Sequence, residues 1–260
     1  MMEDSLSPPS ITNNLDTRFI GQRVIYYPRL TSTMDVAKRE AQQGAVEGTV
    51  VVADEQTAGK GRLKRGWLSP EGNIALSIIL HPSLPYLPSL IMLASLAVVH
   101  SIEAITGLKS QVKWPNDVLI NGRKVCGILI ESEVRGNTVD YAIVGIGVNV
   151  NLRLSAFPEI LSIATSLCEE LGREISRLSL VQRLLVEIEK LYLSLPAGGP
   201  VYEEWRDRLV TLGKRVQVKS GKTMYEGIAE SVASDGSLLL RQSDGSLTRI
   251  VAGDATLAIK

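Results

Sequence analysis

Short β-rich runs joined by turns fill residues 111–152, and this stretch limits the fold more than any other part of the chain. The pair Asn121-Gly122 separates two of the runs, and Asn-Gly favours the tight turn of a β-hairpin. A long apolar segment with helical spacing, 89–107, precedes them and stops at Gly107. Successive hairpins beside an apolar helix predict a mixed, largely antiparallel sheet with helices packed against it, an α/β (α+β) fold class.

Local signals place further strands and helices on both sides of this stretch. Ser32 or Thr33 can cap a helix that Gly44 ends. The turn-rich sequence PAGGP at 196–200 separates a long helical pattern from a shorter one. The expected strands are 23–30, 49–56 and 73–82, and the expected helices are 32–44, 178–195 and 201–210.

Changes in amino-acid composition and in the spacing of turn residues divide the chain into three parts. Residues 1–22 are polar and contain Pro8 and Pro9, which predicts a loose N-terminal arm. Residues 23–212 carry the strands and helices of the main core. Residues 213–260 hold short strands between Ser-Gly and Asp-Gly turns, which is typical of a small β-barrel. A core domain followed by a small second domain fits a chain of 260 residues.

The charge balance argues against a nucleic-acid-binding or membrane-bound protein. The 28 Lys and Arg residues equal the 28 Asp and Glu residues, so no overall field attracts polyanions or an anionic membrane. The two cysteines, Cys126 and Cys168, and the two histidines, His81 and His100, lack the spacing of a metal site or a disulfide framework. The N-terminus lacks a secretory signal, and the longest apolar run, 90–99, is too short to span a bilayer. We expect a cytoplasmic protein.

A cationic, glycine-rich segment, TAGKGRLKRGW at 57–67, contrasts with this neutral background. Four cations fall within six residues and would repel one another without an anion among them. Glycine lets the backbone approach an anion closely, although GKGR has the spacing of neither a P-loop nor a dinucleotide-binding turn. The segment predicts a polyanion site, and the alternative is an ordinary turn with solvated lysines. Trp67 is either a core residue or a face on which a base stacks.

Two further segments indicate a ligand site. KWPND at 113–117 can be a simple turn after a strand, but Lys124 follows inside an apolar run and needs a partner. In GIGVNVN at 145–151, Gly145 and Gly147 interrupt a strand. Glycines interrupt strands where a ligand approaches the backbone closely, and the alternative here is a β-bulge.

Five motifs in order resemble biotin protein ligases, the enzymes that attach biotin to a carrier lysine. They are STM at 32–34, DEQTAGKGRLKRGW at 54–67, KWPNDVL at 113–119, RKVCGILIE at 123–131 and GIGVNVN at 145–151. The resemblance covers residues 23–260. It implies a class II aminoacyl-tRNA synthetase-like catalytic domain over 23–212 and a C-terminal SH3-like β-barrel over 213–260. It also implies the form of these enzymes without an N-terminal DNA-binding domain.

The resemblance implies a two-step ligase reaction, that of a biotin–[acetyl-CoA-carboxylase] ligase. The carboxylate of biotin attacks the α-phosphate of ATP to give biotinyl-5′-adenylate and pyrophosphate. A lysine of a biotin carboxyl carrier domain then displaces AMP. ATP and biotin are the substrates, and Mg²⁺ is expected with ATP. Both steps build negative charge, and one well-placed donor can contribute about 3–4 kcal/mol to stabilising it.

Motif by motif, the resemblance assigns roles to individual residues. The implied catalytic residues are Lys124, Arg62 and Asp117. The implied biotin-binding residues are Ser32, Thr33, Gln56, Gly59, Lys60, Gly61, Arg62, Lys124, Gly127, Gly145 and Gly147. The implied ATP- or adenylate-binding residues are Lys60, Arg62, Arg65, Trp67, Asn116, Lys124 and Asn149. No metal ligand is assigned. Two interpretations of Asp117 stay open: it orients or deprotonates the acceptor lysine, or it only fixes the turn.

The chain differs from the common pattern of these enzymes in three places. Lys60 stands where arginine is usual, and an ammonium cannot make a planar bidentate contact, so we expect a general electrostatic anchor. Met34 stands where asparagine is frequent, so no polar role is expected of it. Leu63 and Lys64 replace a frequent Arg-Gly pair and shift one charge along the loop. We expect residues 59–66 to be poorly ordered without ligand and to fold over it when it binds.

Other functions compete with this interpretation. A lipoate or octanoate ligase of the same superfold needs a similar pocket, but KWPND followed by RKVCGILIE favours biotin. A repressor normally uses a helix-turn-helix domain, for which residues 1–22 leave no room. A nucleic-acid module is disfavoured by the neutral charge, so neither DNA nor a membrane is an expected partner. Both a monomer and a homodimer are compatible with the resemblance.

Overall fold

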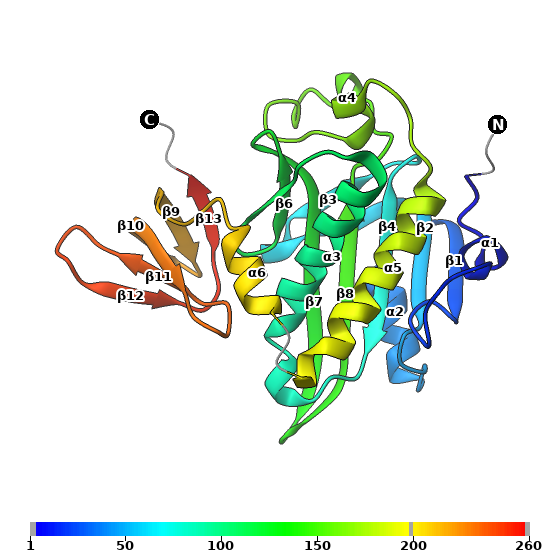
Figure 1. Ribbon diagram of the computed structural model, residues 1–260, viewed down its shortest axis with the longest axis horizontal. Helices are drawn as coiled ribbons and strands as arrows, with labels where there is room; N and C mark the ends of the chain where they lie inside the picture. The colour runs from blue at the N-terminus through cyan, green and yellow to red at the C-terminus, as the bar shows by residue number, and fades with distance from the viewer. Residues whose placement is uncertain (1–3, 198–199, 258–260) are drawn as a thin grey trace.

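The computed structural model describes residues 4–197 and 200–257, which form two β-sheets connected by helices (Figure 1). The strands of the first sheet are β1 Val24–Leu30, β2 Val50–Lys60, β3 Gly66–Ser69, β4 Ile74–Leu80, β5 Gln111–Lys113, β6 Asp117–Ile120, β7 Arg123–Arg135 and β8 Thr138–Val148. Those of the second are β9 Arg215–Ser220, β10 Thr223–Val232, β11 Leu238–Arg241, β12 Leu247–Ile250 and β13 Asp254–Leu257. The helices are α1 Pro8–Thr12, α2 Thr33–Gln42, α3 Ser89–Thr106, α4 Leu167–Leu171, α5 Arg177–Ser194 and α6 Val201–Asp207.

The first sheet has eight strands in the order β1-β2-β4-β8-β7-β6-β5, with β3 paired to β2. β1 runs parallel to β2, and the other neighbouring strands pair antiparallel. This arrangement confirms the predicted mixed, largely antiparallel sheet. The helices predicted over 32–44 and 89–107 correspond to α2 and α3, and Gly107 ends α3 in the left-handed conformation. The short α4 is an element that the sequence analysis did not predict.

Alternate residues of the central strands bury opposite faces of this sheet. Val51 and Ile143 belong to a core cluster with α2, whereas Val52, Ile78 and Val144 belong to the larger core that contains α3 and α5. Figure 1 shows α3 and α5 across one face of the sheet and α2 behind it. Because both faces are covered, the strands contain near-continuous apolar runs, in keeping with the fully buried pattern of β4.

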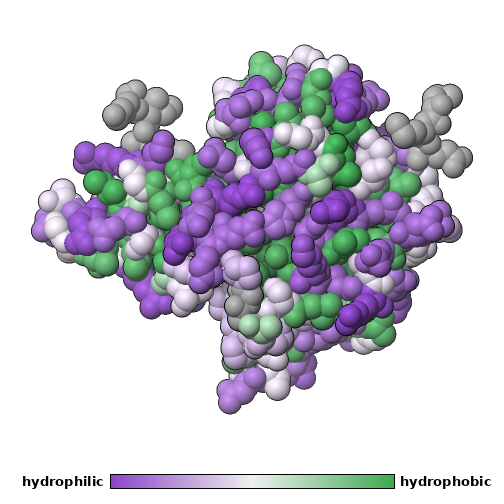
Figure 2. Space-filling model, viewed as in Figure 1, coloured by the Kyte–Doolittle hydropathy of each residue, from purple (hydrophilic) through white to green (hydrophobic). Residues whose placement is uncertain are grey.

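Helix α3 is the central element of the larger core. By length and composition it alone among the described helices could cross a membrane, and 61% of it is buried inside the protein. The prediction that this apolar run forms a buried helix is therefore confirmed. On the face seen in Figure 2, hydrophilic residues form a broad band over α5 and α6. Ion pairs such as Arg208–Glu103, at 2.7 Å, tie the end of α6 to α3 in this region.

The N-terminal segment is packed on the core, so the prediction of a loose arm is wrong for residues 4–22. Leu6 and Ile11 are buried at 1% and 0% exposure. The carboxylate of Glu189, on α5, accepts backbone N–H groups of residues 18–20 at 2.6–3.0 Å. Arg177, at the start of α5, pairs with Asp4 at 2.7 Å. Contacts to a helix more than 160 residues away hold the segment in place.

The second sheet is a five-stranded antiparallel unit that docks beside α3 and α6. Its contact with the first sheet includes Trp114, which is 1% exposed and donates its indole N–H to the carbonyl of Gly236 at 2.8 Å. Tyr202 of α6 donates its hydroxyl to the carbonyl of Val232 at 2.6 Å. These bonds fix the second sheet against the end of the first sheet that carries β5 and β6.

Candidate active site

The cationic segment forms a β-hairpin rather than a loop between two distant strands. β2 continues through Lys60, and β3 pairs back on it with Gly59 opposite Trp67 and Lys60 opposite Gly66. The tip closes through a hydrogen bond from the Gly61 N–H to the carbonyl of Arg65 at 2.8 Å. We call residues 57–69 the glycine hairpin. The β3 half was missed because its glycine-rich start lacks the β-branched residues that indicate a strand.

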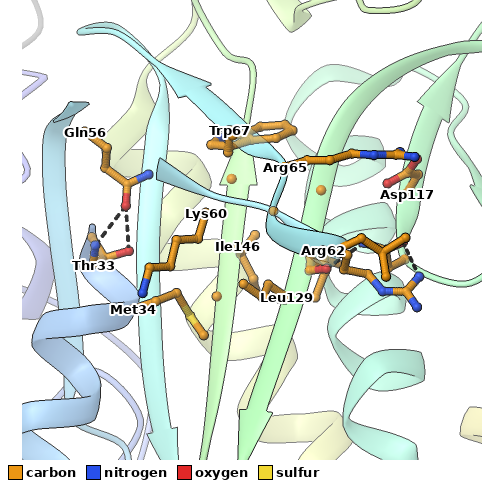
Figure 3. A pocket seen from close by; sticks show the side chains of 18 of the residues that line it. Thr33, Met34, Gln56, Lys60, Arg62, Arg65, Trp67, Asp117, Leu129 and Ile146 are labelled. Atoms are coloured by element: carbon orange, nitrogen blue, oxygen red, sulfur yellow. Dashed lines mark hydrogen bonds between the residues drawn. The ribbon is translucent and has the colours of Figure 1, made fainter. Parts of the chain in front are cut away.

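A cavity of about 120 Å³ lies between the glycine hairpin, the start of α2 and the β7–β8 part of the sheet. Figure 3 shows the hairpin crossing over these strands, with Thr33 and Gln56 at one end of the cavity and Arg62 and Asp117 at the other. A larger and more open hollow of about 550 Å³ lies along the hairpin and is also lined by Leu129 and Glu131 of β7. Ligand pockets usually measure roughly 300–1,000 Å³, a range that includes the open hollow but not the smaller cavity.

Three glycines leave room on the floor of the cavity, beside the side chains of Leu129 and Ile146. Gly127 of β7 lies opposite Gly147 of β8, and Gly145 lies opposite Leu129. The ladder runs without a register shift through both β8 glycines, so they do not form the β-bulge that was the alternative. Trp67 lies on this floor: an added Cβ at Gly147 would be 2.5 Å from Cε2 of the indole, and one at Gly127 would be 3.0 Å from its Cζ3.

A lysine and an aspartate form an ion pair at one end of this floor. Lys124 Nζ lies 2.6 Å from Asp117 Oδ1 and 5.3 Å from the centre of the Trp67 ring. Lys124 precedes Gly127 on β7, and Asp117 opens β6, directly opposite Gly127. The partner that the sequence analysis required for Lys124 is thus Asp117.

Arg62 approaches the same end of the cavity from the glycine hairpin. Its Nη1 donates to Asn116 Oδ1 at 3.2 Å, and Asn116 in turn donates to the carbonyl of Ile128 at 2.7 Å. Burial lowers the pKa of the Arg62 guanidinium, and the charges of Asp254 and Asp117 oppose that effect. The side chain stays cationic, because a guanidinium does not lose its proton in proteins.

The opposite end of the cavity is polar and neutral. Gln56 Oε1 accepts the backbone N–H of Thr33 at 2.8 Å and its hydroxyl at 3.1 Å. Ser77, buried on β4, donates to the Thr33 hydroxyl at 2.9 Å. Met34 adds an apolar wall and packs against Gly145. This end can bind a neutral polar head group flanked by an apolar body.

Two further cations of the hairpin pair with carboxylates from distant elements. Lys60 forms an ion pair with Asp35 of α2. Arg65 Nη1 lies 2.5 Å from Asp254 Oδ2, and Asp254 opens β13 of the second sheet and lines the cavity. Lys60 and Arg65 thus have acidic partners, as Lys124 does, whereas Arg62 contacts the neutral Asn116.

The structure brings most of the predicted site residues to this one cavity. Those that line it are Thr33, Gln56, Lys60, Gly61, Arg62, Arg65, Trp67, Asn116, Asp117, Lys124, Gly127, Gly145 and Gly147. Three others do not line it. Ser32 precedes α2 with its hydroxyl buried, Gly59 lines the open hollow, and Asn149 uses its side-chain amide on the carbonyl of Thr165 at 3.0 Å.

The sequence analysis missed several residues that line or support the site: Met34 as an apolar wall, Asp35, Ser77, Leu129 and Asp254. Leu129 had a usable signal, because it lies two residues after Gly127 and strand alternation puts both on one face. Asp254 had none, since it comes from another sheet. Among the described residues no cluster of three or more His, Cys, Asp or Glu side chains could hold a metal ion.

Comparison with known proteins identifies the family. Residues 26–149 match the biotin/lipoate A/B protein ligase family, and residues 211–257 match the biotin protein ligase C-terminal domain. The chain is 39% identical over 258 residues to the bifunctional ligase/repressor BirA of Bacillus subtilis, covering 97% of this chain and 79% of the relative. It is 30% identical over 266 residues to the biotin--[acetyl-CoA-carboxylase] ligase of Mycobacterium tuberculosis, covering 96% and 97% of the two chains.

The solved structures agree. The biotin protein ligase of Aquifex aeolicus in complex with biotin and ATP superposes with a TM-score of 0.77 at 30% identity, covering 92% of this chain and all of the other. The matched regions contain the glycine hairpin, the glycine floor, the Lys124–Asp117 pair and the second sheet with Asp254. On this evidence the chain belongs to the biotin protein ligase family.

Proposed function

We propose that this protein activates biotin with ATP to biotinyl-5′-adenylate and transfers biotin to a lysine of a carboxyl carrier domain. The observation that carries the proposal is one cavity with a neutral polar end, a floor opened by three glycines and a cationic end. The Aquifex aeolicus relative is described in complex with biotin and ATP, and the Mycobacterium tuberculosis relative is named for acetyl-CoA-carboxylase. Both descriptions agree with the chemistry of this site.

In the first step a carboxylate oxygen of biotin forms a bond to the α-phosphorus, and the bond from that phosphorus to pyrophosphate breaks. The neutral end with Thr33 and Gln56 would hold the ring system of biotin, so that its carboxylate points toward Lys124. Lys124 and Arg62 would stabilise the charge that develops on the α-phosphate, each by a charge-assisted hydrogen bond. Trp67 would offer its ring to the adenine base.

In the second step the amine of the carrier lysine bonds to the acyl carbon, the acyl–oxygen bond to AMP breaks, and the amine gives up one proton. Asp117 is the carboxylate nearest to Lys124, so it is our proposed acceptor of that proton. The alternative is that Asp117 only holds Lys124 in place. Asp117→Asn separates the two: a proton acceptor slows transfer with little effect on adenylate formation, whereas a purely positioning carboxylate slows both steps. Equal wild-type rates in both steps contradict either role.

Magnesium would accompany ATP. Asp117 and Asp254 are carboxylates that line the cavity, and each is already paired with a cation. Triphosphate oxygens and water would therefore supply most of the Mg²⁺ ligands, as Mg²⁺ prefers. The bound ion would neutralise part of the phosphate charge.

The deciding experiment incubates the protein with biotin, Mg-ATP and a biotin carboxyl carrier domain, and follows the mass of the carrier. The expected result is a gain of one biotin on one lysine, absent with lipoate in place of biotin. Lys124→Gln should abolish the gain, while the exposed Lys109→Gln should keep it. Transfer of lipoate but not of biotin would assign the protein to the other branch of the matched family.

The relatives named ligase/repressor raise the question of DNA binding. Residues 4–22 contain only the five-residue helix α1 and pack on the core, so this segment is not a helix-turn-helix. We therefore propose that residues 4–22 do not bind operator DNA. Separately, we propose that the protein works in the cytoplasm as a monomer or a homodimer. Electrophoretic mobility shift with operator DNA at physiological salt, and sedimentation with and without biotin and ATP, test these points.

A further inference from the structure

The tip of the glycine hairpin has little apolar packing of its own. Gly61 and Gly66 flank it, and the one apolar side chain between them, that of Leu63, is 54% exposed in a left-handed backbone conformation with φ 55°. Hydrophobic burial therefore cannot fix the direction in which the tip points. Polar side-chain contacts must do so.

Three cationic side chains of the hairpin, those of Lys60, Arg62 and Arg65, reach polar partners outside it, and each of these partners comes from a different part of the chain. Lys60 meets Asp35 of α2, Arg62 meets Asn116 just before β6, and Arg65 meets Asp254 of β13. Lys60 is the last residue of β2 before the tip, and Arg62 and Arg65 lie within the tip. The Arg65 contact is the one that ties the tip to the second sheet.

Asp254 is a firm anchor for this contact. Its side chain is 25% exposed, against 64% for Arg65, so the carboxylate is held better than the guanidinium. Its strand pairs with β9, with Asp254 opposite Lys219. The preceding Gly253 allows close approach, because a Cβ there would lie 2.8 Å from Cγ1 of Val218 and 3.0 Å from the carbonyl oxygen of Lys219. The backbone at this position is thus fixed by packing that only glycine permits.

We propose that Asp254 is a positioning residue that holds Arg65, and with it the hairpin tip, over the nucleotide end of the cavity. The second sheet then completes the site with one carboxylate rather than serving only as a separate unit. The inference rests on the proposed function for its kinetic part. Arg65 keeps further N–H donors besides Nη1, so a phosphate oxygen can bind it while Asp254 stays in contact.

A competing effect has the opposite sign. Asp254 lines the cavity, and a carboxylate there repels phosphate. If repulsion dominates, Asp254→Asn lowers the KM for ATP; if holding the tip dominates, it raises the KM. We expect the second, because the substitution frees a long side chain whose conformational entropy is then lost on binding ATP.

The experiment compares Asp254→Asn with Glu230→Gln, a matched control that removes a carboxylate from the Glu230–Arg241 ion pair elsewhere in the same sheet. Two readouts are used: amide hydrogen exchange at residues 61–66 without ligand, and the KM values for ATP and biotin in pyrophosphate release. Melting temperatures establish that both variants fold.

Asp254→Asn should speed exchange at the tip and raise the KM for ATP by about two- to fivefold each, the range expected for a largely exposed ion pair. In Asp254→Asn the KM for biotin and the kcat should stay within about twofold of wild type. Asp254→Glu should restore the exchange rate and the KM for ATP. The double variant Arg65→Gln/Asp254→Asn should show the same exchange rate and KM for ATP as Arg65→Gln alone. An unchanged or lower KM for ATP, or exchange equal to that of Glu230→Gln, overturns the proposal. Hydrogen exchange does not depend on enzymatic activity. It therefore tests the Arg65–Asp254 contact even if the wild-type protein makes no adenylate.

Discussion

Gly147→Ala should displace Trp67 and weaken ATP binding far more than Gly145→Ala does. The added Cβ at Gly147 would lie 2.5 Å from Cε2 of the indole and closer still to Nε1, nearer than real Cβ contacts occur. β8 cannot yield, because it is a central strand in which Gly147 lies in register between Ala75 of β4 and Gly127 of β7. The indole must therefore leave the floor of the cavity.

The magnitude follows from what the indole does in the proposed reaction. Stacking of an aromatic ring on a base contributes about 1–3 kcal/mol, so the KM for ATP should rise about 5- to 150-fold in pyrophosphate release at saturating biotin. Gly145→Ala is the matched control on the same strand. Its Cβ would overlap Sδ of Met34 and lie 3.1 Å from its Cγ, and a flexible thioether can rotate away. The KM for ATP should then change by less than about threefold, since one rotamer change costs about 1 kcal/mol or less.

Tryptophan fluorescence gives an independent readout without ligand. Of the three tryptophans, Trp114 and Trp205 are 1% and 0% exposed, so a change in emission reports mainly Trp67. Gly147→Ala should shift the emission to the red, and Gly145→Ala should not. If both variants have the same KM for ATP and the same emission, the proposal that Gly147 provides the space in which the Trp67 indole packs is refuted.

Two predictions concern ionisable groups. Partial burial is the largest single influence on Glu103 and acts to raise its pKa, but the hydrogen bond and charge of Arg208, the Ser110 N–H and the charge of Lys109 together hold the pKa below its usual range. The ionised carboxylate therefore stabilises the folded state above the pKa of Glu103 in the unfolded chain, and this stabilisation is lost as the pH falls. Glu103→Gln should lower the free energy of unfolding in urea by about 1 kcal/mol at pH 7 and by less at pH 3. An equal loss at both pH values would contradict this explanation. Burial also raises the pKa of the Cys126 thiol, against the charge of Lys124. Native protein at pH 8 should accordingly react with iodoacetamide at Cys126 at least about 100-fold more slowly than urea-unfolded protein, and stability should fall above about pH 8.5, where the unfolded thiol ionises.

Local signals were enough to predict the main helices and the shared site. Gly107 ends α3 because a glycine can adopt the left-handed conformation there, whereas Ser32 precedes α2 without a capping hydrogen bond from its side chain. The Lys124–Asp117 pair was within reach of the sequence, because one hairpin turn joins their strands. Motif order then indicated that segments far apart in the chain share one cavity.

Features that depend on distant contacts were not visible. Asp254 reaches the cavity because Trp114 and Tyr202 dock the second sheet, and nothing near residue 254 signals this. Trp114 itself shows the limit of a motif. Its neighbours Asn116 and Asp117 face the cavity, whereas its own indole points away and binds the carbonyl of Gly236. One short motif therefore both lines the site and attaches the second sheet.

The N-terminal segment is the clearest case of a missed long-range contact, and it yields a test. Its polar composition hides buried apolar residues, among them Ile11 at 0% exposure. Ile11→Ala should lower the free energy of unfolding by about 2–4 kcal/mol, as for other buried large-to-small substitutions. Asp16→Ala is the matched control, because Asp16 is exposed on the same segment and should change stability by less than about 0.5 kcal/mol. In a loose arm the two substitutions would have equal, small effects in urea unfolding, so the difference between them measures how firmly α5 holds residues 4–22.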